Sequence, residues 1–331
     1  MTRRFDLRVE TLPLAAPFRI SRGEKREVRE IRVAVAEGAL AGEGTSVPYA
    51  RYGESVESVL ATLEALRSDV EGGLQLDELQ DRLQPGSARN ALDCALWDLR
   101  AKKQGRPVTE LIDVPAVNEF STMRTVVLDT PENMAGAAAA FPKGGALKVK
   151  LDGERVLERL GAVHAAAPSS PLVADPNEGW DAVLLKKAFP QLRSLGVVLL
   201  EQPLSERQDG YLSEIAHPVP VCADESCRTV SDLPRLKGRY DALNIKLDKT
   251  GGFTGALALH RAAREEGFKV MLGCLTGSAL AVAPLVALAG AADYIDLDGP
   301  LLLAKGYGGG MEEIPGSLRV RFNHPWGRAR P

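Results

Sequence analysis

The chain has 331 residues, of which 45% are hydrophobic, and it carries a formal net charge of −3 with a pI of about 5.9. This length can bury a large core and allows one barrel-sized domain together with a smaller one. Because the sequence contains no basic run, nucleic acid and anionic membranes are excluded as expected partners.

The N-terminus and the cysteines predict a cytoplasmic protein. The opening MTRRFDLRVE is charged and lacks the apolar centre of a secretion signal. The richest apolar stretch, ALAVAPLVALAGAA, is shorter than the roughly 18–20 residues of a membrane span and contains a proline. No CxxC pair is present, and with only four histidines a zinc site is not expected. The sequence therefore predicts buried free thiols in a reducing compartment, at Cys94, Cys222, Cys227 and Cys274.

Residues 1–118 are predicted to form a small α+β capping domain. Segments 5–14 and 29–38 alternate polar and apolar residues, which is typical of antiparallel strands. The segment between them, PFRISRGEKRE at 17–27, is expected to be a loop.

A Gly-, Ser- and Pro-containing stretch at 42–55 is also expected to be a loop. Apolar residues at helical spacing follow at 58–70 and 88–105, where Gly105 and Pro107 are expected to end the helix. No regular alternation of strands and helices is present in this part of the chain.

Residues 119–308 show that alternation and are predicted to form an α/β barrel. Eight short apolar segments recur with helical segments between them, and Thr130 with Pro131 is expected to start the first helix. The connections have room for single helices, so a closed parallel barrel of the modified (β/α)8 TIM type, (β/α)7β, is expected. Residues 309–331 are expected to return to the capping domain. The eight segments are STMRTVVL, ALKVK, PLVAD, VVLLE, PVCAD, ALNIK, KVMLG and YIDLD.

Five charged side chains end consecutive predicted strands, at intervals of 25, 26, 23 and 22 residues. The C-terminal ends of barrel strands meet around one mouth, where the active sites of such barrels lie. Three carboxylates in succession would repel one another unless a cation stood between them, and oxygen ligands without histidine indicate Mg²⁺, with Mn²⁺ as a possible substitute. In chain order the five residues are Lys150, Asp175, Glu201, Asp224 and Lys246.

The lysines are candidate bases on either side of this predicted metal site. Lys148 and Lys150 lie two apart on one strand and therefore face the same side. Each ammonium group would disfavour the charged form of the other, which could lower a lysine pKa towards neutrality. The alternatives are a solvated pair at this strand and, for Lys246, a salt bridge to Asp248. Glu225 is expected to face away from Asp224 if the strand continues.

The order KVK, DPN, EQP, DES and NIK with LDKTGG resembles the enolase superfamily, in its muconate-lactonizing-enzyme subgroup. The resemblance covers nearly the whole chain. It implies that Mg²⁺ on the three acids stabilises the enolate formed when a lysine removes a proton next to a carboxylate. A divalent cation offsets negative charge at the oxygen where that charge develops.

Members of this subgroup share these residues but differ in substrate, so other residues must indicate the reaction. Asp296 and Asp298 form a DxD pair similar to that of the dipeptide epimerases, where it holds the free amino terminus; helix capping is the structural alternative. Asn177 is expected to orient a ligand or bound water, and Thr125 in the first strand is a further substrate-binding candidate. After the seventh strand, the Glu-Ser pair that is common in the family is missing. The substrate contacts that this strand makes in the family can therefore not be carried over to this chain.

The loop containing Arg22 is similar to one that closes over the barrel mouth in this superfamily. Arg22 resembles in position the arginine that meets a glutamate side chain in alanine-glutamate epimerases; Arg19 is the rival, and either could be solvated. A cation there would favour an acidic second residue.

The sequence therefore predicts a Mg²⁺-dependent dipeptide epimerase that inverts the C-terminal residue by a two-base proton transfer, with L-Ala-D/L-Glu as the expected substrate. The resemblance implies a role in breaking down peptidoglycan peptides and a homo-oligomer. N-acylamino-acid racemisation, o-succinylbenzoate synthesis and cycloisomerisation are the alternatives among enzymes. A catalytically silent ligand-binding barrel is the alternative from another class.

Overall fold

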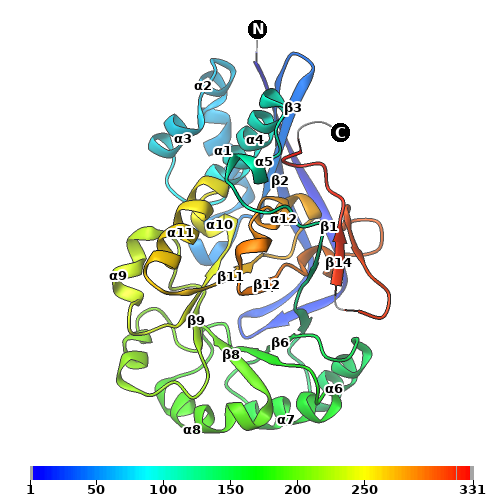
Figure 1. The fold of residues 1–331 in the computed structure, drawn as a ribbon, viewed down its shortest axis with the longest axis vertical. Coiled ribbons are helices and arrows are strands. Elements are labelled where there is room, and N and C mark those ends of the chain that lie inside the picture. The colour runs from blue at the N-terminus through cyan, green and yellow to red at the C-terminus, as the bar shows by residue number, and fades with distance from the viewer. Residues whose placement is uncertain (1–2, 318, 329–331) are drawn as a thin grey trace.

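The computed structural model describes residues 3–317 and 319–328, and its two main parts are a capping region and a barrel (Figure 1). The capping region contains an antiparallel three-stranded sheet in the order β1-β2-β3. Its strands are β1 (Arg3–Ile20), β2 (Gly23–Glu37) and β3 (Leu40–Ser46). Alternate residues of β2, among them Ile31, Val33 and Val35, are buried, as expected for a sheet with one covered face.

The segment 17–27 is not an open loop but the end of a long hairpin. Phe18, Arg19 and Ile20 pair with Lys25, Glu24 and Gly23, after a register shift that follows Pro13. The alternation rule misses this hairpin because Arg, Glu and Lys replace the apolar residues at its tip. Figure 1 shows the hairpin running alongside the barrel, so the capping sheet reaches the barrel strands.

The predicted loop at 42–55 is also partly wrong, because its first residues belong to β3. The predicted helix at 58–70 is divided at Leu66, and the helix predicted at 88–105 ends at Gly105 as expected, with this glycine in the left-handed region. The helical elements here are η1 (Ala50–Tyr52), α1 (Val56–Ala65), α2 (Arg67–Glu71), α3 (Leu76–Arg82), α4 (Ser87–Gln104) and α5 (Val108–Leu111).

Eight parallel strands form the barrel, in the chain order that the sequence predicts. The amide of Met123 donates to the carbonyl of Ile295 over 2.9 Å, which joins the first strand region to the last and closes the sheet. The strands are β5 (Arg124–Val126), β6 (Leu147–Lys150), β7 (Leu172–Asp175), β8 (Val197–Glu201), β9 (Val221–Ala223), β10 (Ala242–Ile245), β11 (Lys269–Gly273) and β12 (Tyr294–Asp296).

Helical segments connect successive strands, and the predicted barrel fold is confirmed. Thr130 caps the first of these helices and Pro131 is its first residue. The helical elements after β8 and β9 are short, and they consist of 3-10 turns and a single helical turn. The connecting elements are α6 (Pro131–Ala140), α7 (Val156–Ala166), α8 (Ala182–Leu192), η2 (Arg193–Leu195), η3 (Asp209–Glu214), η4 (Val230–Asp232), α9 (Leu233–Leu236), α10 (Leu247–Thr250), α11 (Phe253–Glu265), α12 (Ala279–Val286), η5 (Ala289–Ala291) and, after β12, η6 (Gly299–Leu302).

The C-terminal segment forms a second small sheet, in the order β13-β14-β4. Its strands are β4 (Glu119–Ser121), β13 (Met311–Glu313) and β14 (Arg319–Phe322). Beyond it, the Trp326 indole donates to the carbonyl of Cys94, and the Gly327 amide donates to Asp98 on α4. The domain boundaries at 118/119 and 308/309 stay a prediction, although β4 pairs outside the barrel.

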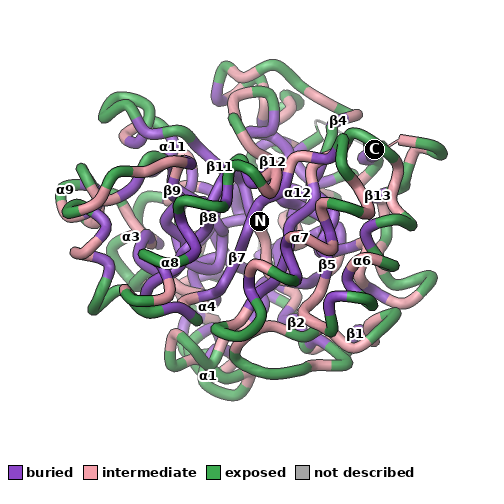
Figure 2. Tube along the Cα trace, turned by 90° about the horizontal axis from the view of Figure 1, so that it is seen from below, coloured by how far each residue is buried: buried purple, intermediate pink, exposed green. Residues whose placement is uncertain are grey.

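Buried residues occupy the middle of the molecule (Figure 2). A compact layer fills the barrel interior and combines side chains from six strand regions. Its members are Met123, Val173, Leu199, Cys222, Ala242 and Met271. Because side chains alternate along a strand, the residue two positions further on from each of these also faces the interior, nearer the mouth.

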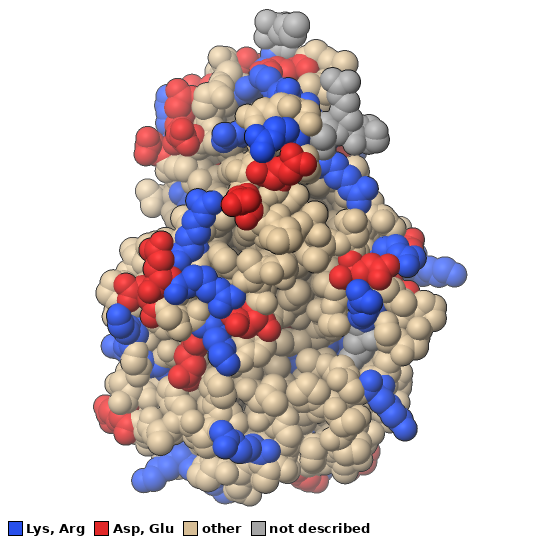
Figure 3. Space-filling view, in the orientation of Figure 1, with Lys and Arg blue, Asp and Glu red and all other residues tan. Residues whose placement is uncertain are grey.

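On the face seen in Figure 3, lysine and arginine side chains are interspersed with aspartate and glutamate. This mixture gives the face no single-sign field of the kind that attracts polyanions. None of the described helices is both long and apolar enough to cross a membrane.

Candidate active site

The interior layer of the barrel explains how the predicted charged residues reach the mouth. Asp175, Glu201 and Asp224 each lie two residues beyond a member of that layer, namely Val173, Leu199 and Cys222. All three acids are buried. The period of two along each strand therefore turns them all towards the barrel axis.

A cavity of about 410 Å³ lies between the β1–β2 hairpin, the loop at 49–52 and the barrel mouth. Of the predicted site residues, it is lined by Arg22, Lys150, Asn177, Asp224 and Lys246. The other predicted residues are buried and do not line it. They are Thr125, Lys148, Asp175, Glu201, Asp296 and Asp298.

Each of the two predicted lysines that line the cavity is paired with one acid. Lys150 Nζ lies 2.5 Å from Asp175 Oδ2 and 3.2 Å from Asn177 Oδ1. Lys246 Nζ lies 2.6 Å from Asp224 Oδ2. The predicted alternative partner of Lys246, Asp248, instead accepts hydrogen bonds from the capping region. The two candidate bases thus enter one cavity from β6 and from the end of β10.

Lys148 is surrounded by acids, which contradicts the idea that Lys150 lowers its pKa. Its Nζ lies 2.6 Å from Asp296, 2.8 Å from Glu201 and 3.1 Å from Asp175. Burial alone would lower the pKa of Lys148, but Asp296 and the other acids outweigh burial and raise it well above its usual value. Lys148 is therefore a buried ammonium group that joins three carboxylates.

The three predicted metal ligands affect one another electrostatically. Burial and the neighbouring Asp175 raise the pKa of Glu201 to about 7. Burial alone would raise the pKa of Asp175, but Lys150 and Lys148 outweigh it and lower the pKa to about 2. In the same way, Lys246 and Lys249 hold the pKa of Asp224 well below its usual value.

Lysine ammonium groups stand between these acids, and no three His, Cys, Asp or Glu side chains in the described ranges converge closely enough to hold an ion as they lie. The donor set nevertheless fits Mg²⁺. Lys148 already places a positive charge between Asp175 and Glu201. Glu201 Oε2 has no hydrogen-bond partner in the described part of the chain, although this ammonium lies 2.8 Å away. Three buried carboxylates without histidine are the oxygen-rich ligands that Mg²⁺ prefers.

The DxD pair lies below the cavity on β12 and just after it. Asp296 Oδ2 accepts the hydrogen bond from Lys148, while Asp296 Oδ1 is buried with no partner among the described residues. Asp298 Oδ2 accepts a hydrogen bond of 2.8 Å from the amide of Thr125. Burial and the neighbouring Asp296 raise the pKa of Asp298 to about 6. This region therefore holds more acceptors than donors.

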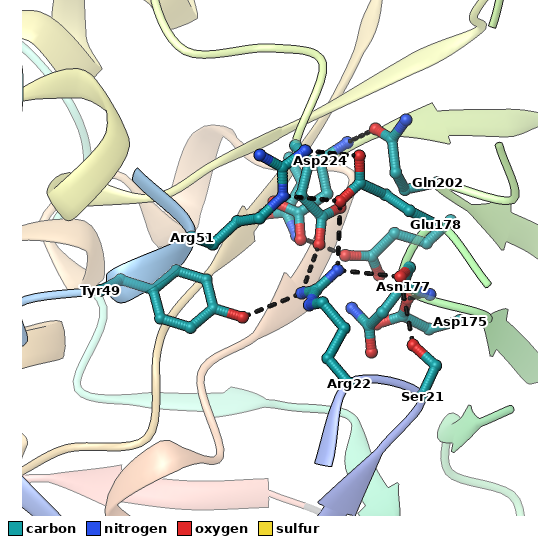
Figure 4. Close-up of polar contacts among 12 residues, drawn as sticks. Ser21, Arg22, Tyr49, Arg51, Asp175, Asn177, Glu178, Gln202 and Asp224 are labelled. Atoms are coloured by element: carbon teal, nitrogen blue, oxygen red, sulfur yellow. Dashed lines mark hydrogen bonds and ion pairs between the residues drawn. The ribbon is translucent and has the colours of Figure 1, made fainter. Parts of the chain in front are cut away.

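Arg22, at the tip of the hairpin, reaches the barrel loops (Figure 4). It donates to Glu225 over 2.7 Å, to the carbonyl of Asn177 over 2.8 Å and to the Tyr49 hydroxyl over 2.9 Å. Its rival Arg19 instead pairs with Glu24 on the exposed side of the hairpin. Of the two arginines, it is therefore Arg22 that the structure brings to the cavity.

Glu225 is turned towards the cavity, which corrects the expectation that it faces away from Asp224. The strand β9 ends at Ala223, so the alternation of side chains no longer applies at Glu225. Both carboxylates line the cavity, and Glu225 forms the ion pair with Arg22. A strand one residue shorter than the sequence suggests is enough to produce this difference.

Sequence reasoning missed three further residues of the site. Lys25, in the hairpin arm, lines the cavity, and burial together with Lys150 and Lys246 lowers its pKa to about 8. Lys249 is buried and donates to Asp224 Oδ1 over 2.7 Å. Tyr52 lines the cavity from the 49–52 loop. For Lys249 the sequence offers a signal, because it lies in the LDKTGG motif of the family pattern. Lys25 lies in the segment that the sequence predicts to be a loop, and no pattern there points to the cavity.

The loop after β11 forms another part of the cavity wall, through Cys274, Leu275 and Thr276. Ser278 at its end donates to Glu30 of β2 from both its amide and its hydroxyl. Cys274 is partly and not fully buried, which corrects the prediction for one of the four cysteines. Desolvation raises the pKa of its thiol, so it is not a reactive thiolate.

A β/α barrel with acids and lysines at its mouth, closed by a hairpin from a separate α+β region, defines the enolase-like class of enzymes. Residues 133–300 match the enolase C-terminal domain-like family, and residues 5–113 match the N-terminal domain of mandelate racemase / muconate lactonizing enzymes. The chain therefore belongs to the enolase superfamily, in the mandelate racemase and muconate lactonizing enzyme group.

The chain is similar to epimerases and racemases among characterised relatives. It is 44% identical to L-Ala-D/L-Glu epimerase of Escherichia coli (strain K12) over 313 residues, which are 94% of this chain and 98% of the relative. It is 45% identical to N-acetyl-D-glutamate racemase of a Pseudoalteromonas species over 277 residues, 83% of this chain and 88% of the relative. The prediction of an enzyme of the isomerase class is confirmed.

Solved structures give the same result. An enolase family member from Agrobacterium tumefaciens with homology to dipeptide epimerases, solved with sodium and L-Ala-L-Glu, is 41% identical with a TM-score of 0.93, covering 98% of this chain and all of that one. A dipeptide epimerase from Methylococcus capsulatus, complexed with Mg and L-Arg-D-Lys, is 29% identical with a TM-score of 0.87, covering 99% of each chain.

Proposed function

We propose that the protein is a Mg²⁺-dependent dipeptide epimerase that inverts the α-carbon of the C-terminal residue, with L-Ala-D/L-Glu as its substrate. The observation that carries this proposal is that Lys150 and Lys246 enter one cavity from separate strands, beside one group of carboxylates. Inversion requires one base on each face of the α-carbon, and two lysines meet that need. The relatives named as dipeptide epimerases support the substrate class.

In this proposal the lysines exchange the α-proton between them. One lysine, as the neutral amine, removes the proton, and the other, as the ammonium, returns one to the opposite face; the roles swap with the direction. Burial alone would lower the pKa of Lys246, but Asp224 outweighs it and raises the pKa, so Lys246 must leave Asp224 to act as a base. Lys25 lines the same cavity as both lysines.

Asp175, Glu201 and Asp224 would hold Mg²⁺, with Mn²⁺ as a possible substitute. When bound, the ion supplies positive charge where the substrate carboxylate gains negative charge on loss of the α-proton. Asn177, which contacts Lys150 and whose amide donates to Asp175, would orient the substrate or a bound water. The relative from Methylococcus capsulatus, solved with Mg, supports this choice of metal.

Asp296 and Asp298, with Thr125 holding Asp298 in place, would meet the free ammonium group of the dipeptide. Asp296 Oδ1 is buried with no partner within the described ranges, and an ammonium donor would satisfy it. An N-acylated substrate carries no such charge. N-acylamino-acid racemisation is nevertheless the second candidate, because a relative at 45% identity is named N-acetyl-D-glutamate racemase.

The positive end of the cavity would select an acidic second residue. Arg22 and Lys25 both line it. The guanidinium of Arg22 is shared with Glu225 and Glu178, whereas Lys25 forms no ion pair among the described residues and lies over the Phe18 ring. We therefore assign the selection of a side-chain carboxylate to both cations. Variants at Arg22 and at Lys25 can show how much each cation contributes to this selection.

The cellular role would be the recycling of peptidoglycan peptides in the cytoplasm, by a homo-oligomer without a nucleic-acid or membrane partner. The peptidoglycan role and the homo-oligomer rest on the family resemblance, and the lack of a nucleic-acid or membrane partner rests on the composition of the chain. A catalytically silent barrel would leave the two lysines at the cavity without a use.

Proton exchange in D₂O tests the proposal. With Mg²⁺ and L-Ala-L-Glu or L-Ala-D-Glu, the wild type should incorporate deuterium at the glutamate α-carbon from either enantiomer. Lys150→Ala and Lys246→Ala should each lower epimerisation by at least about 10²–10⁴-fold. Each variant should still exchange the proton of one enantiomer only, because one base remains on its face of the α-carbon.

Retained epimerisation in both lysine variants would overturn the two-base mechanism. A library of L-Ala-L-Xaa dipeptides, with deuterium uptake read by mass, separates the candidate substrates. Uptake confined to acidic Xaa supports the Ala-Glu assignment, and uptake with apolar or basic Xaa keeps an epimerase of different specificity. Uptake with N-acetyl-glutamate but with no dipeptide would favour the racemase.

A further inference from the structure

Gln202, the residue after Glu201, combines complete burial with a backbone conformation that favours glycine. Its exposed fraction is 0% and its φ is 36°. A non-glycine residue in this region is strained, and such strain persists only where the surroundings hold the residue in place. The contacts of the Gln202 side chain identify what holds it.

Both ends of the Gln202 amide are fully engaged. Its Oε1 accepts hydrogen bonds from the amide of Asp224 over 2.8 Å and from the amide of Ser226 over 3.1 Å. Its Nε2 lies 2.8 Å from the carbonyl of Leu204, 2.8 Å from Ser226 Oγ and 2.9 Å from the Tyr240 hydroxyl. Figure 4 shows the contact between Gln202 and Asp224.

The backbone of Gln202 extends these links to the strand β9 and to the loop after β7. Its amide donates to the carbonyl of Cys222 over 2.9 Å, and its carbonyl accepts from the amide of Glu178 over 2.8 Å. Gln202 therefore joins the loops that follow β7, β8 and β9. The first two of these loops begin directly after Asp175 and Glu201, and the third begins at Asp224.

We propose that Gln202 is a positioning residue that holds these three loops together and turns Asp224 and Glu225 into the cavity. Two consecutive side chains of a strand face opposite sides, and here both line one cavity. They do so because the chain leaves the strand at Ala223, and Gln202 Oε1 holds the amides on either side of Glu225. Gln202 itself is absent from the cavity lining, so it acts through Asp224 and Glu225.

The consequence for Mg²⁺ rests on the proposed function, whereas the effect on the loop does not. If Asp224 is a metal ligand, loss of Gln202 should weaken Mg²⁺ binding about 10- to 100-fold, as is usual for groups that orient a ligand. The loop effect is measured separately, by hydrogen exchange of the amides of Asp224 and Ser226.

The test compares Gln202→Met, which keeps the length of the side chain and removes its hydrogen bonds, with Gln191→Met on the exposed face of α8. Hydrogen exchange by mass spectrometry and Mg²⁺ titration by calorimetry are measured on the full chain. We expect Gln202→Met to exchange the 224–226 amides about tenfold faster or more, since two hydrogen bonds are lost, and to bind Mg²⁺ more weakly. Gln191→Met should change neither quantity.

Unchanged exchange at 224–226 in folded Gln202→Met would overturn the inference, as would a lower melting temperature with unchanged Mg²⁺ affinity. Tyr240→Phe, which removes one partner of the amide, decides the question if Gln202→Met does not fold: faster exchange at 224–226 supports the inference and unchanged exchange overturns it. A wild type that binds no Mg²⁺ would overturn the proposed function, while the exchange result would still decide the role of Gln202.

Discussion

At the scale of single residues, the site is an arrangement of paired and unpaired cations. Lys148, Lys150, Lys246 and Arg22 each contact a carboxylate, whereas Lys25 forms no ion pair in the described part of the chain. Lys25 is half-buried, and a cation withdrawn from water without a counter-ion is costly, so desolvation lowers its pKa to about 8. A substrate carboxylate would remove this cost.

Replacing Lys25 should therefore change specificity more than turnover. We expect Lys25→Met to raise KM for L-Ala-L-Glu about tenfold or more, because a charge-assisted hydrogen bond is lost. The rate with L-Ala-L-Leu should change little, since that substrate has no carboxylate for Lys25. Steady-state kinetics with both dipeptides measure the difference.

Arg19→Met, on the exposed side of the same hairpin, is the matched control and should leave both substrates unaffected. Arg22→Met separates the shares of the two cations: an equal loss for both dipeptides would mean that Arg22 fastens the hairpin to Glu225. A loss confined to L-Ala-L-Glu would make Arg22 a selector as well. Equal effects of Lys25→Met on both dipeptides would contradict its assignment.

The pH dependence of selection follows from the direction of this pKa shift. Lys25 is charged below its pKa of about 8 and neutral above it. In the free enzyme, the preference of kcat/KM for L-Ala-L-Glu over L-Ala-L-Leu should therefore be largest below pH 8 and decline as the pH rises through that value. Lys25→Met should show no such decline, and a preference independent of pH in the wild type would contradict the prediction.

At the scale of elements, the close packing of β3 on α4 holds the sheet and the helices of the capping region together. A Cβ atom at Gly44 would lie 2.1 Å from the carbonyl of Ala91 and 2.7 Å from the amide of Ala95. Both clashes are with helix backbone, which cannot move without shifting α4. The strand and helix therefore approach each other more closely than a side chain allows.

Gly44→Ala should consequently destabilise the protein by about 1–3 kcal/mol or more, as overpacking of a tight contact does. Urea unfolding followed by circular dichroism measures the change. Gly136→Ala in α6 is the matched control, because its Cβ meets nothing within 4 Å. It should stabilise the protein by roughly 0.5–1 kcal/mol, since alanine favours the helix. Equal stability of Gly44→Ala and the wild type would refute the packing argument.

At the scale of the whole molecule, the site is shared between parts that are distant in sequence. The hairpin and the 49–52 loop supply one wall of the cavity, and the barrel supplies the other. Arg22 and Arg51 fasten these parts together through Glu178 and Glu225. Ligand binding at the mouth should therefore stabilise the whole fold.

Mg²⁺ should raise the melting temperature if the three acids bind it. At about 100 times its dissociation constant, the ion should add roughly 2.7 kcal/mol of stability, and chelation should remove this gain. Asp175→Asn should abolish the response, whereas Glu265→Gln on the exposed face of α11 should retain it. Differential scanning calorimetry with and without Mg²⁺ decides, and a wild type that does not respond would contradict the metal site.

Local sequence patterns were enough to predict the barrel and the set of charged residues at its mouth. Strand alternation and the interval between strands are local properties. The directions of Asp175, Glu201, Asp224, Lys150 and Lys246 could therefore be predicted from them. The position of Arg22 at the cavity could be predicted only through family resemblance.

How these groups pair with one another could not be predicted from such local patterns. Lys148 pairs with Asp296, a residue 148 positions away, and no local pattern indicates this contact. The hairpin that carries Lys25 could not be recognised, because its tip is polar and is held by contacts with the barrel loops. The direction of Glu225 depends on where β9 ends, at Ala223. The side-chain amide of Gln202, in the loop after β8, holds the chain at this point. Pairing across a barrel depends on loop ends and long-range packing, which a period of two along a strand does not encode.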